Sequence, residues 1–332
     1  MSIRVEQPGM LTTVQDLGRR GHQQEGVPVS GAMDRLAHRV ANMLVGNDEN
    51  AAALEITLLG PSLTFTTDTL IAIGGADLGA HAGSVDLPPW RPAWVPARTR
   101  LGFSGRPSGC RAYLAVGGGI DTPMVLGSRS TFIRGGFGGV NGRALQRGDV
   151  LTIANLTPLS ERITAKVRSS SAHVSLAHWS ASPLLRPAYG ASVVVHLLSD
   201  VHTPLLTDGA RERLFGSEFR LASQSDRMGL RLDGPVMELS QPTELLSEGV
   251  AFGTVQLPPG GAPIILMADR QTTGGYPRIA CVASIDLPLV AQLRPGDRLR
   301  FQPISLREAQ AMYIAREQDL AQARVGIALR HP

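Results

Sequence analysis

The polar residues of this chain that are best suited to chemistry stand in clusters beside glycines. The first cluster lies within residues 12–22 and contains Asp16, Arg19, Arg20 and His22. Glycines let backbone N–H groups approach a ligand, and guanidinium groups bind anions through paired hydrogen bonds. We therefore predict that Arg19 and Arg20 bind an anionic substrate and that Asp16 and His22 are catalytic. The alternative is a turn between Asp16 and Arg19 that only anchors the N-terminus.

Two further positions in the first half are candidate binding groups. Ser30 and Asp34 mark the start of a predicted helix, with Ser30 as its cap, and the amides at such a start also bind anions. Structural capping alone is the alternative. Asp77 follows an apolar strand and two glycines, so it either orients a substrate amide or hydroxyl, or ends the strand in a turn.

A glycine-rich stretch covers residues 117–142. The amides of Gly117, Gly118 and Gly119 predict a backbone cradle for a phosphate or a carboxylate, with Arg129 as an additional anion-binding group. A mobile loop is the alternative interpretation of the same glycines.

The second half of the chain holds the largest set of candidates, and most of them follow the predicted strand 264–267. We predict that Asp269 and Tyr276 are catalytic, because they offer an acceptor and a phenol beside an amide. The predicted substrate-binding side chains are Arg227, Glu248, Gln271 and Thr273, and the predicted backbone cradle is Gly274 and Gly275. We predict no metal site.

These clusters are separated by short apolar runs, which are typical of an all-β barrel or sandwich. The predicted strands are residues 54–59, 63–65, 70–73, 100–103, 113–116, 150–153, 193–198, 236–239, 264–267, 279–283 and 298–301. The predicted helices are residues 33–45, 207–215, 287–293 and 306–323.

The two halves repeat one pattern. Leu145–Ile153 matches Leu293–Phe301 in a Gly-Asp turn that leads into an apolar strand, and Leu59-Gly60-Pro61 is a weaker counterpart of Asp233-Gly234-Pro235. We therefore expect two tandem β-barrel lobes with a cleft between them as the site. The predicted division is a first lobe at 1–160, a connection at 161–189 around Ser169–Ser171, a second lobe at 190–305, and a helix and tail at 306–332.

Composition excludes several classes of protein. The 332 residues include 37 glycines and 23 prolines, too many for a long-helix or coiled-coil protein. The net charge of +4 is spread along the chain without a basic run, so we predict no nucleic-acid partner. Because no apolar stretch or N-terminal signal is present, we predict no membrane association and a cytoplasmic location, with Cys110 and Cys281 reduced.

Several standard catalytic motifs are missing from the sequence. It has no G-x-x-x-x-G-K-[ST] phosphate loop, no H-E-x-x-H and no G-x-S-x-G. The single lysine, Lys166, lies outside any biotin-attachment pattern, so we predict that biotin is not attached to this chain.

A series of motifs runs in order from about Glu6 to Phe301. The motifs are QDLGRRGHQQEGVPVSGAMD, ALEITLLGP, GGADL, AYLAVGGGID, VLGSRST, GGFGGVNGRALQRGD, SDRMGLRLDGP, SEGVAFGTVQLPPGG and MADRQTTGGYPRIA. This series resembles the carboxyltransferase family of urea amidolyase, which is also called allophanate hydrolase subunit 2, KipA or the C subunit of 5-oxoprolinase. The resemblance implies a mainly β chain with two cyclophilin-like β-barrel lobes, a few short helices and a C-terminal helix.

The resemblance also implies a function and partners. The expected function is that of a component of an ATP-dependent 5-oxoprolinase, inactive alone, in which ATP activates the lactam carbonyl before water opens the ring. One expected partner, with which ATP is shared, is a chain like allophanate hydrolase subunit 1 (KipI-like, the B subunit of 5-oxoprolinase). The other is a chain of the lactam-utilisation family (the A subunit of 5-oxoprolinase). The alternatives are carboxyl transfer from carboxybiotin to urea with a separate biotin carboxylase system, and a KipA-like regulatory role in binding a kinase inhibitor.

Overall fold

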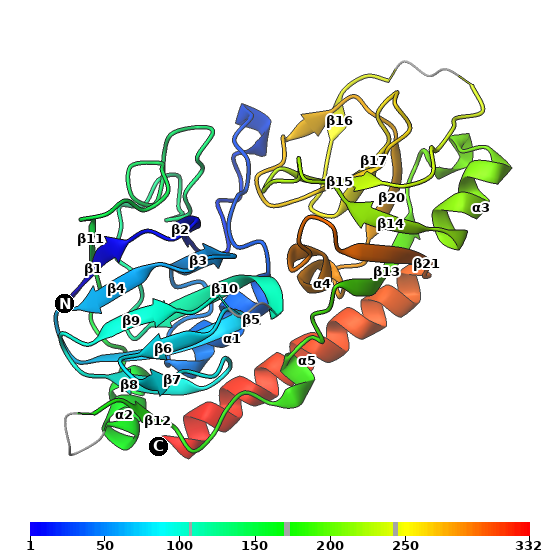
Figure 1. The fold of residues 1–332 in the computed structure, drawn as a ribbon. Helices are drawn as coiled ribbons and strands as arrows, with labels where there is room; N and C mark the ends of the chain where they lie inside the picture. The colour runs from blue at the N-terminus through cyan, green and yellow to red at the C-terminus, as the bar shows by residue number, and fades with distance from the viewer. Residues whose placement is uncertain (106–107, 169–172, 242–244) are drawn as a thin grey trace. The chain divides into compact units, whose positions relative to one another are not determined.

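The structure is a computed structural model that describes residues 1–105, 108–168, 173–241 and 245–332. The chain divides into two compact units (Figure 1). Unit 1 comprises Met1–Arg19, Asp34–Pro187 and Glu317–Pro332, and unit 2 comprises Arg20–Met33 and Ala188–Arg316. This division departs from the predicted boundaries, because residues 20–33 belong to the second unit and most of the predicted connection belongs to the first. Ser169–Ser171 lie outside the described residues.

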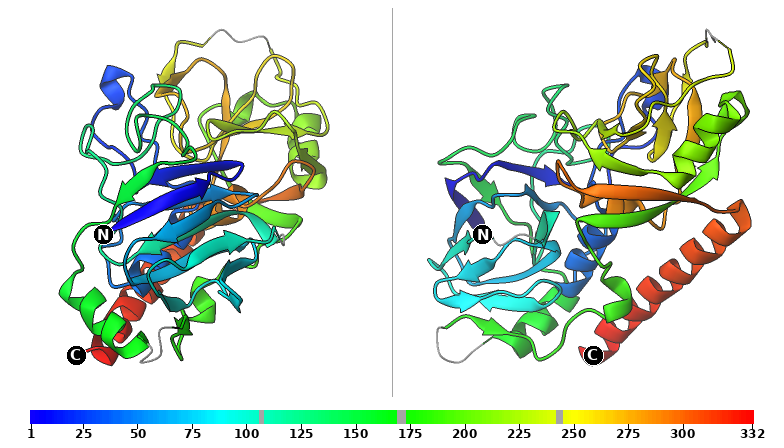
Figure 2. Two further views of the ribbon diagram at one scale, coloured as in Figure 1. Left: turned by 60° about the vertical axis from the view of Figure 1, so that its left-hand side comes forward. Right: turned by 45° about the vertical axis from the view of Figure 1, so that its right-hand side comes forward.

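Unit 1 is built from two six-stranded sheets that share one apolar core (Figure 2). The first sheet has the order β11 (Val150–Thr152), β1 (Ser2–Gln7), β4 (Ser62–Phe65), β9 (Arg100–Phe103), β6 (Ala80–Ala82) and β7 (Val85–Asp86). The second has the order β12 (Ser175–Leu176), β8 (Pro92–Val95), β5 (Thr69–Asp77), β10 (Ser108–Val116), β3 (Ala53–Thr57) and β2 (Leu11–Gln15). The strands of unit 1 in the described part of the chain therefore form two six-stranded sheets around one core.

One helix of unit 1 lies directly on the second sheet. Helix α1 (Arg35–Leu44) contacts β5 and β10, and Asp34 caps it by accepting a 2.9 Å hydrogen bond from the Ala37 amide. A Cβ at Gly74 would lie 2.4 Å from the Ala37 carbonyl oxygen, so glycine is needed there for the helix to approach the sheet. The cap of this helix is Asp34, which corrects the prediction that Ser30 serves as the cap.

Unit 2 is a closed barrel. Its strand order is β13 (Ser192–Ser199), β20 (Arg278–Val282), β17 (Thr254–Gln256), β18 (Ile264–Leu266), β15 (Gly229–Asp233), β14 (Glu218–Leu221) and β21 (Arg298–Pro303). The parallel pairing of β13 with β21 closes the barrel around a core that includes Phe219 and Phe301, whose ring centroids are 5.3 Å apart. A separate ribbon pairs β16 (Glu248–Gly249) with β19 (Thr273–Gly274). The prediction of a mainly β fold is confirmed.

The remaining helices are α2 (Pro158–Val167), α3 (Asp208–Gly216), α4 (Leu287–Ala291) and α5 (Leu306–Arg330), with single turns of 3₁₀ helix at Gln23–Glu25, Pro183–Leu185 and Thr203–Leu205. Helix α2 lies in the predicted connection, where polar composition concealed its buried Ile163 and Val167. Residues 236–239 form no strand beyond a bridge at Leu239, which corrects that prediction. Helix α5 continues past the predicted end at 323 to Arg330. No helix in the described ranges is long and apolar enough to span a membrane.

The two Gly-Asp turns have the same hydrogen bonds in the two units. In unit 1, the Asp149 carboxylate accepts from the Gln146 amide at 2.7 Å; Gly148 donates to the Val5 carbonyl, and Val5 donates to the Asp149 carbonyl. In unit 2 the corresponding groups of Asp297, Arg294, Gly296 and Leu221 make the same contacts, the carboxylate contact being 2.8 Å. The repeat seen in the sequence therefore corresponds to the same hydrogen-bonded Gly-Asp turn in both units.

Candidate functional site

Asp16 lies at the centre of a buried hydrogen-bond cluster in unit 1. Its carboxylate accepts from the Ser128 hydroxyl at 2.7 Å, from the Gly18 amide at 2.8 Å and from the Arg129 amide at 2.6 Å. The Ser130 hydroxyl donates to the same carboxylate and accepts from the Asp16 amide at 3.0 Å. A carboxylate with this many donors is fixed in place and holds a loop together. The geometry thus supports the structural interpretation of Asp16 and not the catalytic one.

Arg19 is buried in the same loop. Its guanidinium group donates to the Ser130 carbonyl and lies 4.9 Å from the centroid of the Phe137 ring. Gly138, with φ of 74°, allows this approach, because a Cβ there would lie 2.8 Å from Arg19 Nη2. Arg19 is only 1% exposed, so its contacts favour a structural role over the predicted anion binding.

The amides of Gly117, Gly118 and Gly119, which were predicted to form a cradle, have hydrogen-bond partners within the protein. Each of the three amides donates to a group of the protein at 2.8 Å; the acceptors are the Leu70 carbonyl, Asn47 Oδ1 and the Val116 carbonyl, in that order. An amide that is already engaged does not bind a phosphate. These glycines are instead required for close packing, since a Cβ at Gly118 would lie 2.3 Å from the Ala154 carbonyl oxygen.

The other predicted residues of unit 1 lie near the surface. Asp77 is exposed and accepts a 2.9 Å hydrogen bond from the Gly79 amide, which is the turn given as the alternative. Arg129 is partly exposed and pairs with Asp121 at 2.9 Å. Both of these side-chain contacts are local, and neither is made to another predicted site residue. Arg129 contacts Asp16 through its backbone amide alone.

The sequence reasoning missed a buried polar network between α1 and the second sheet. The Tyr113 hydroxyl donates to Glu55 at 2.7 Å and accepts from the Asp34 amide at 2.8 Å. His38 packs edge-on against Tyr113, and burial lowers the pKa of this histidine. Burial also raises the pKa of Tyr113 well above its ordinary value. The register of β3 with β10 places Glu55 opposite Tyr113, a signal that alternation alone does not reveal.

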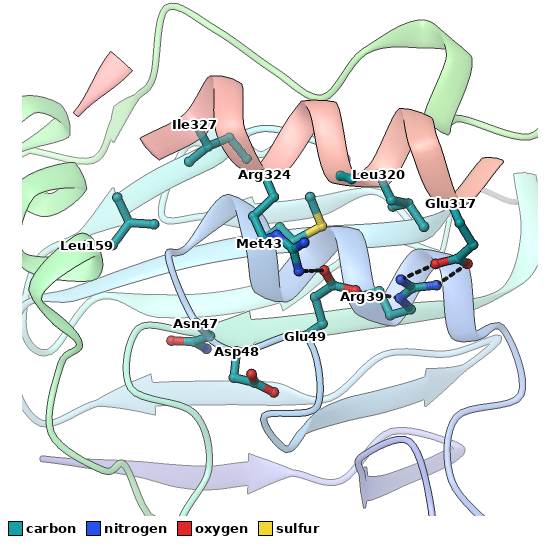
Figure 3. A pocket seen from close by; sticks show the side chains of 11 residues that line it. Arg39, Met43, Asn47, Asp48, Glu49, Leu159, Glu317, Leu320, Arg324 and Ile327 are labelled. Carbon is teal, nitrogen blue, oxygen red and sulfur yellow. Dashed lines mark hydrogen bonds and ion pairs between the residues drawn. The ribbon is translucent and has the colours of Figure 1, made fainter. Parts of the chain in front are cut away.

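A charged pocket of about 250 Å³ lies between α1 and the C-terminal part of α5 in unit 1 (Figure 3). Arg39 donates to both carboxylate oxygens of Glu317, at 2.6 and 2.8 Å, and to Glu49 at 2.6 Å. Arg324 pairs with the other oxygen of Glu49 at 3.2 Å. The two arginines are paired with the two glutamates, and these ion pairs fasten α5 to α1, so the pocket is a poor candidate for a ligand site.

Arg227 and Asp269 form a buried ion pair in unit 2. The guanidinium group makes a two-pronged contact with the carboxylate at 2.8 and 3.0 Å, and both side chains are 8% exposed or less. Arg227 also donates to the Gly31 carbonyl at 2.7 Å. Two residues predicted to act on a substrate therefore act on each other, and together they anchor the segment Arg20–Met33 to the barrel.

The segment Arg20–Met33 begins at the surface and ends buried. Arg20 is exposed, and His22 contacts Glu25 through Nδ1 at 2.9 Å with its side chain 30% exposed. Ser30 is completely buried, has φ of 56°, and its hydroxyl has no hydrogen-bond partner in the described part of the chain. The catalytic role of His22 and the binding role of Arg20 stay predictions.

The β16–β19 ribbon gathers most of the predicted residues of the second half. Glu248 lies opposite Gly274, and Gly249 opposite Thr273. The amide of Gln271 donates to the Gln256 side-chain carbonyl at 3.2 Å, and Gln256 donates to the Tyr276 backbone carbonyl at 3.4 Å. A Cβ at Gly274 would lie 2.4 Å from Gln256 Nε2, so this glycine admits the pair of amides.

Charged residues that the sequence reasoning left out stand beside this ribbon. Arg278 bridges Glu248 at 3.1 Å and Asp200 at 3.8 Å and donates to the Gly249 carbonyl at 2.9 Å. Burial lowers the pKa of Arg270 to about 10, which still leaves it charged at neutral pH. Burial raises the pKa of Cys281 to about 11, so this thiol is protonated and unreactive.

Tyr276 and Gly275 line a pocket of unit 2 that is about 810 Å³ in volume. The other lining residues are mainly apolar: Val236, Met237, Glu238, Leu239, Gln241, Leu245, Leu257, Pro258, Pro259 and Pro277. Tyr276 is 47% exposed, so its phenol is accessible. An apolar pocket beside a row of amides, hydroxyls and charges is a usual setting for a small-molecule site. We take the ribbon and this pocket as the candidate site.

Comparison with known proteins identifies the family. The carboxyltransferase domain family, subdomains A and B, matches residues 25–303. This chain is a member of that family. Its sequence is 40% identical over 309 residues to the C subunit of 5-oxoprolinase from Escherichia coli, covering 92% of this chain and 93% of that protein. It is 39% identical over 301 residues to the C subunit of 5-oxoprolinase from Haemophilus influenzae, covering 90% of this chain and 89% of that one.

Among solved structures, this carboxyltransferase-family chain resembles the urea amidolyase of K. lactis with a TM-score of 0.86 and 33% identity. The match covers 96% of this chain and 20% of the urea amidolyase chain. The match of residues 25–303 covers the whole ribbon and pocket of unit 2, so the candidate site lies within the family's shared domain.

Proposed function

We propose that this chain is the carboxyltransferase-family component of an ATP-dependent 5-oxoprolinase, which opens 5-oxoproline to L-glutamate. The observation that carries the proposal is the 40% identity to the C subunit of 5-oxoprolinase from Escherichia coli over 92% of this chain and 93% of that protein. An alignment over both lengths leaves no large domain of that relative without a counterpart here.

The chemistry of the candidate site suits a cyclic amide. Gln271 donates to the Gln256 side-chain carbonyl at 3.2 Å, and exchanging this one contact for a lactam would pair the donor of Gln271 with the ring C=O and the acceptor of Gln256 with the ring N–H. Tyr276 is an accessible phenol at the edge of the pocket. We propose that the two glutamines orient the lactam and that Tyr276 exchanges a proton with it, whereas Asp16 and Asp269 are positioning residues.

The reaction needs activation, because a lactam carbonyl is a poor electrophile. The carbonyl oxygen takes the γ-phosphoryl group of ATP, which releases ADP. Water then adds to the activated carbon, and the C–N bond breaks as the ring nitrogen takes up a proton, which gives an acyl phosphate. A second water hydrolyses this acyl phosphate to glutamate and phosphate. Because the amides of Gly117–Gly119 are used internally, we propose that the triphosphate is bound largely by the partner chain.

We propose that this chain has two partners in the enzyme. One is the B subunit of 5-oxoprolinase, a chain like allophanate hydrolase subunit 1, and the other is the A subunit, a chain of the lactam-utilisation type. The pocket of about 810 Å³ is several times larger than 5-oxoproline needs, so part of it is left for a partner to fill. A site completed by a partner predicts that this chain alone has no activity.

The test compares two substrates on the reconstituted complex. Release of ADP should depend on 5-oxoproline and should produce glutamate. Urea carboxyl transfer is the second candidate, favoured by the TM-score of 0.86 to the urea amidolyase of K. lactis. Urea-dependent turnover with a biotin carboxylase system, and none with 5-oxoproline, would replace the first proposal by the second.

A further inference from the structure

Ser30 has two features that lower the stability of the fold and that a structural role does not explain. Its φ of 56° is a conformation that residues other than glycine rarely adopt, and the following Gly31 has φ of 87°. Its hydroxyl is fully buried and has no hydrogen-bond partner within the described ranges. A buried hydroxyl without a partner and a strained backbone both destabilise a protein, and such features gather at ligand sites.

The amides around Ser30 point to the same conclusion. Within the described part of the chain, the N–H groups of Ser30, Gly31 and Ala32 donate to no other group. Ser30, Gly31 and Ala32 are all buried, so bulk water does not satisfy these donors. Successive unused amides in a tight turn form a concave site that binds anions.

Arg227 strengthens one of these donors and holds the turn in place. It donates to the Gly31 carbonyl at 2.7 Å. The Gly31 carbonyl and the Ala32 amide belong to one peptide unit, so the arginine polarises that amide and makes it a better donor. Asp269 fixes Arg227 from the other side, and Met33 packs in the barrel core, so the turn is held from both ends.

We propose that the Ser30 hydroxyl and the amides of residues 30–32 form a binding nest for the carboxylate of a small acid. Resting on the function proposed above, that acid is 5-oxoproline, and the nest is its carboxylate subsite. A carboxylate offers several lone pairs to these donors, and binding in a site without water makes each contact stronger. Arg227 and Asp269 are the positioning residues of the nest. Because the nest is buried, a ligand reaches it only when neighbouring residues move aside. The surface stretch Arg20–Gly26 precedes the nest in the chain.

The test uses the opposite effects of Ser30→Ala on stability and on binding. Removing an unpaired buried hydroxyl should raise the melting temperature of this chain by about 2–4 °C. In the reconstituted complex the same change should raise KM for 5-oxoproline about tenfold with little change in kcat. Leu126→Gly is the matched control, because Leu126 also has positive φ, 52°, but is 43% exposed in unit 1. It should raise stability without changing KM.

Two ligands separate the carboxylate from the rest of the substrate. Acetate should raise the melting temperature of the wild-type chain more than chloride does at equal ionic strength, and Ser30→Ala should abolish that difference. The lactam 2-pyrrolidinone, which lacks a carboxylate, should bind the wild-type and Ser30→Ala complexes equally. An acetate effect that survives in Ser30→Ala, or an unchanged KM for 5-oxoproline, overturns the nest. A wild-type complex that does not act on 5-oxoproline overturns the proposed function instead, and the acetate comparison still decides the nest.

Discussion

The Arg227–Asp269 pair gives a quantitative test of whether Asp269 is structural. Both side chains are 8% exposed or less, so Asp269→Asn leaves a guanidinium charge buried without its partner. Breaking a buried pair in this way costs about 3–5 kcal/mol. For a domain the size of unit 2, that loss lowers the melting temperature by about 6–20 °C.

The assay is urea and thermal denaturation of the purified chain, followed by circular dichroism. Asp77→Asn is the matched control, because Asp77 is exposed and makes only a turn contact with the Gly79 amide at 2.9 Å. Asp77→Asn should lower the free energy of unfolding by about 1 kcal/mol or less.

A second variant separates the charge effect from the loss of packing. Arg227→Met combined with Asp269→Leu removes both charges and should recover most of the stability lost in Asp269→Asn. A remaining deficit of about 1–3 kcal/mol is expected, because the buried Gly31 carbonyl loses its donor. If Asp269→Asn melts like the wild type while the complex loses activity, Asp269 is catalytic and the structural account is refuted.

Three other changes test the account elsewhere. Gly118→Ala should lower the free energy of unfolding by about 2 kcal/mol more than Gly127→Ala does. The reason is that a Cβ at Gly118 would lie 2.3 Å from the Ala154 carbonyl oxygen, whereas nothing lies within 4 Å of a Cβ at Gly127. Equal melting temperatures of the two variants would contradict this. Burial lowers the pKa of His38, so the unfolded chain takes up a proton that the folded chain does not. The free energy of unfolding should then fall below pH 6.5 by up to about 1.4 kcal/mol per pH unit, and His38→Gln should flatten that slope in denaturation curves; an unchanged slope would refute it. Glu317→Gln should weaken the Arg39 contacts and lower the free energy of unfolding by about 1 kcal/mol, and this loss should shrink at high salt. No loss at low salt would mean that solvent already screens the pair fully.

The sequence predicted the fold where the pattern was local. Strand β9 (Arg100–Phe103) was predicted with its observed bounds, and the Gly-Asp turns at Asp149 and Asp297 were recognised because turn chemistry depends on a few adjacent residues. Helix α2 was missed because its buried face is narrow and its other residues are polar. Residues 236–239 have the apolar pattern of a strand, but their side chains form part of a pocket wall.

The candidate site was predicted less well, for a physical reason. A glycine-flanked charged residue has the same sequence signature whether it faces a ligand or a partner within the fold. Arg227 and Asp269 are 42 positions apart, and only the closed barrel reveals that they satisfy each other. Likewise, the amides of Gly117–Gly119 donate hydrogen bonds to acceptors in β5, β10 and the turn after α1. Ser30 was predicted both as a helix cap and as an anion-binding residue, but its unpartnered hydroxyl and positive φ appear only in three dimensions.

The most direct test of the central proposal is an omission experiment with the purified components of the enzyme. ADP and glutamate are measured from 5-oxoproline and ATP with the two partner chains in the presence and absence of this chain. The account predicts that the complete mixture forms ADP and glutamate in equal amounts and that this chain alone, or the mixture without it, forms neither. Full turnover by the two partner chains without this chain, or by this chain alone, would contradict the proposal that it is an essential component of the enzyme.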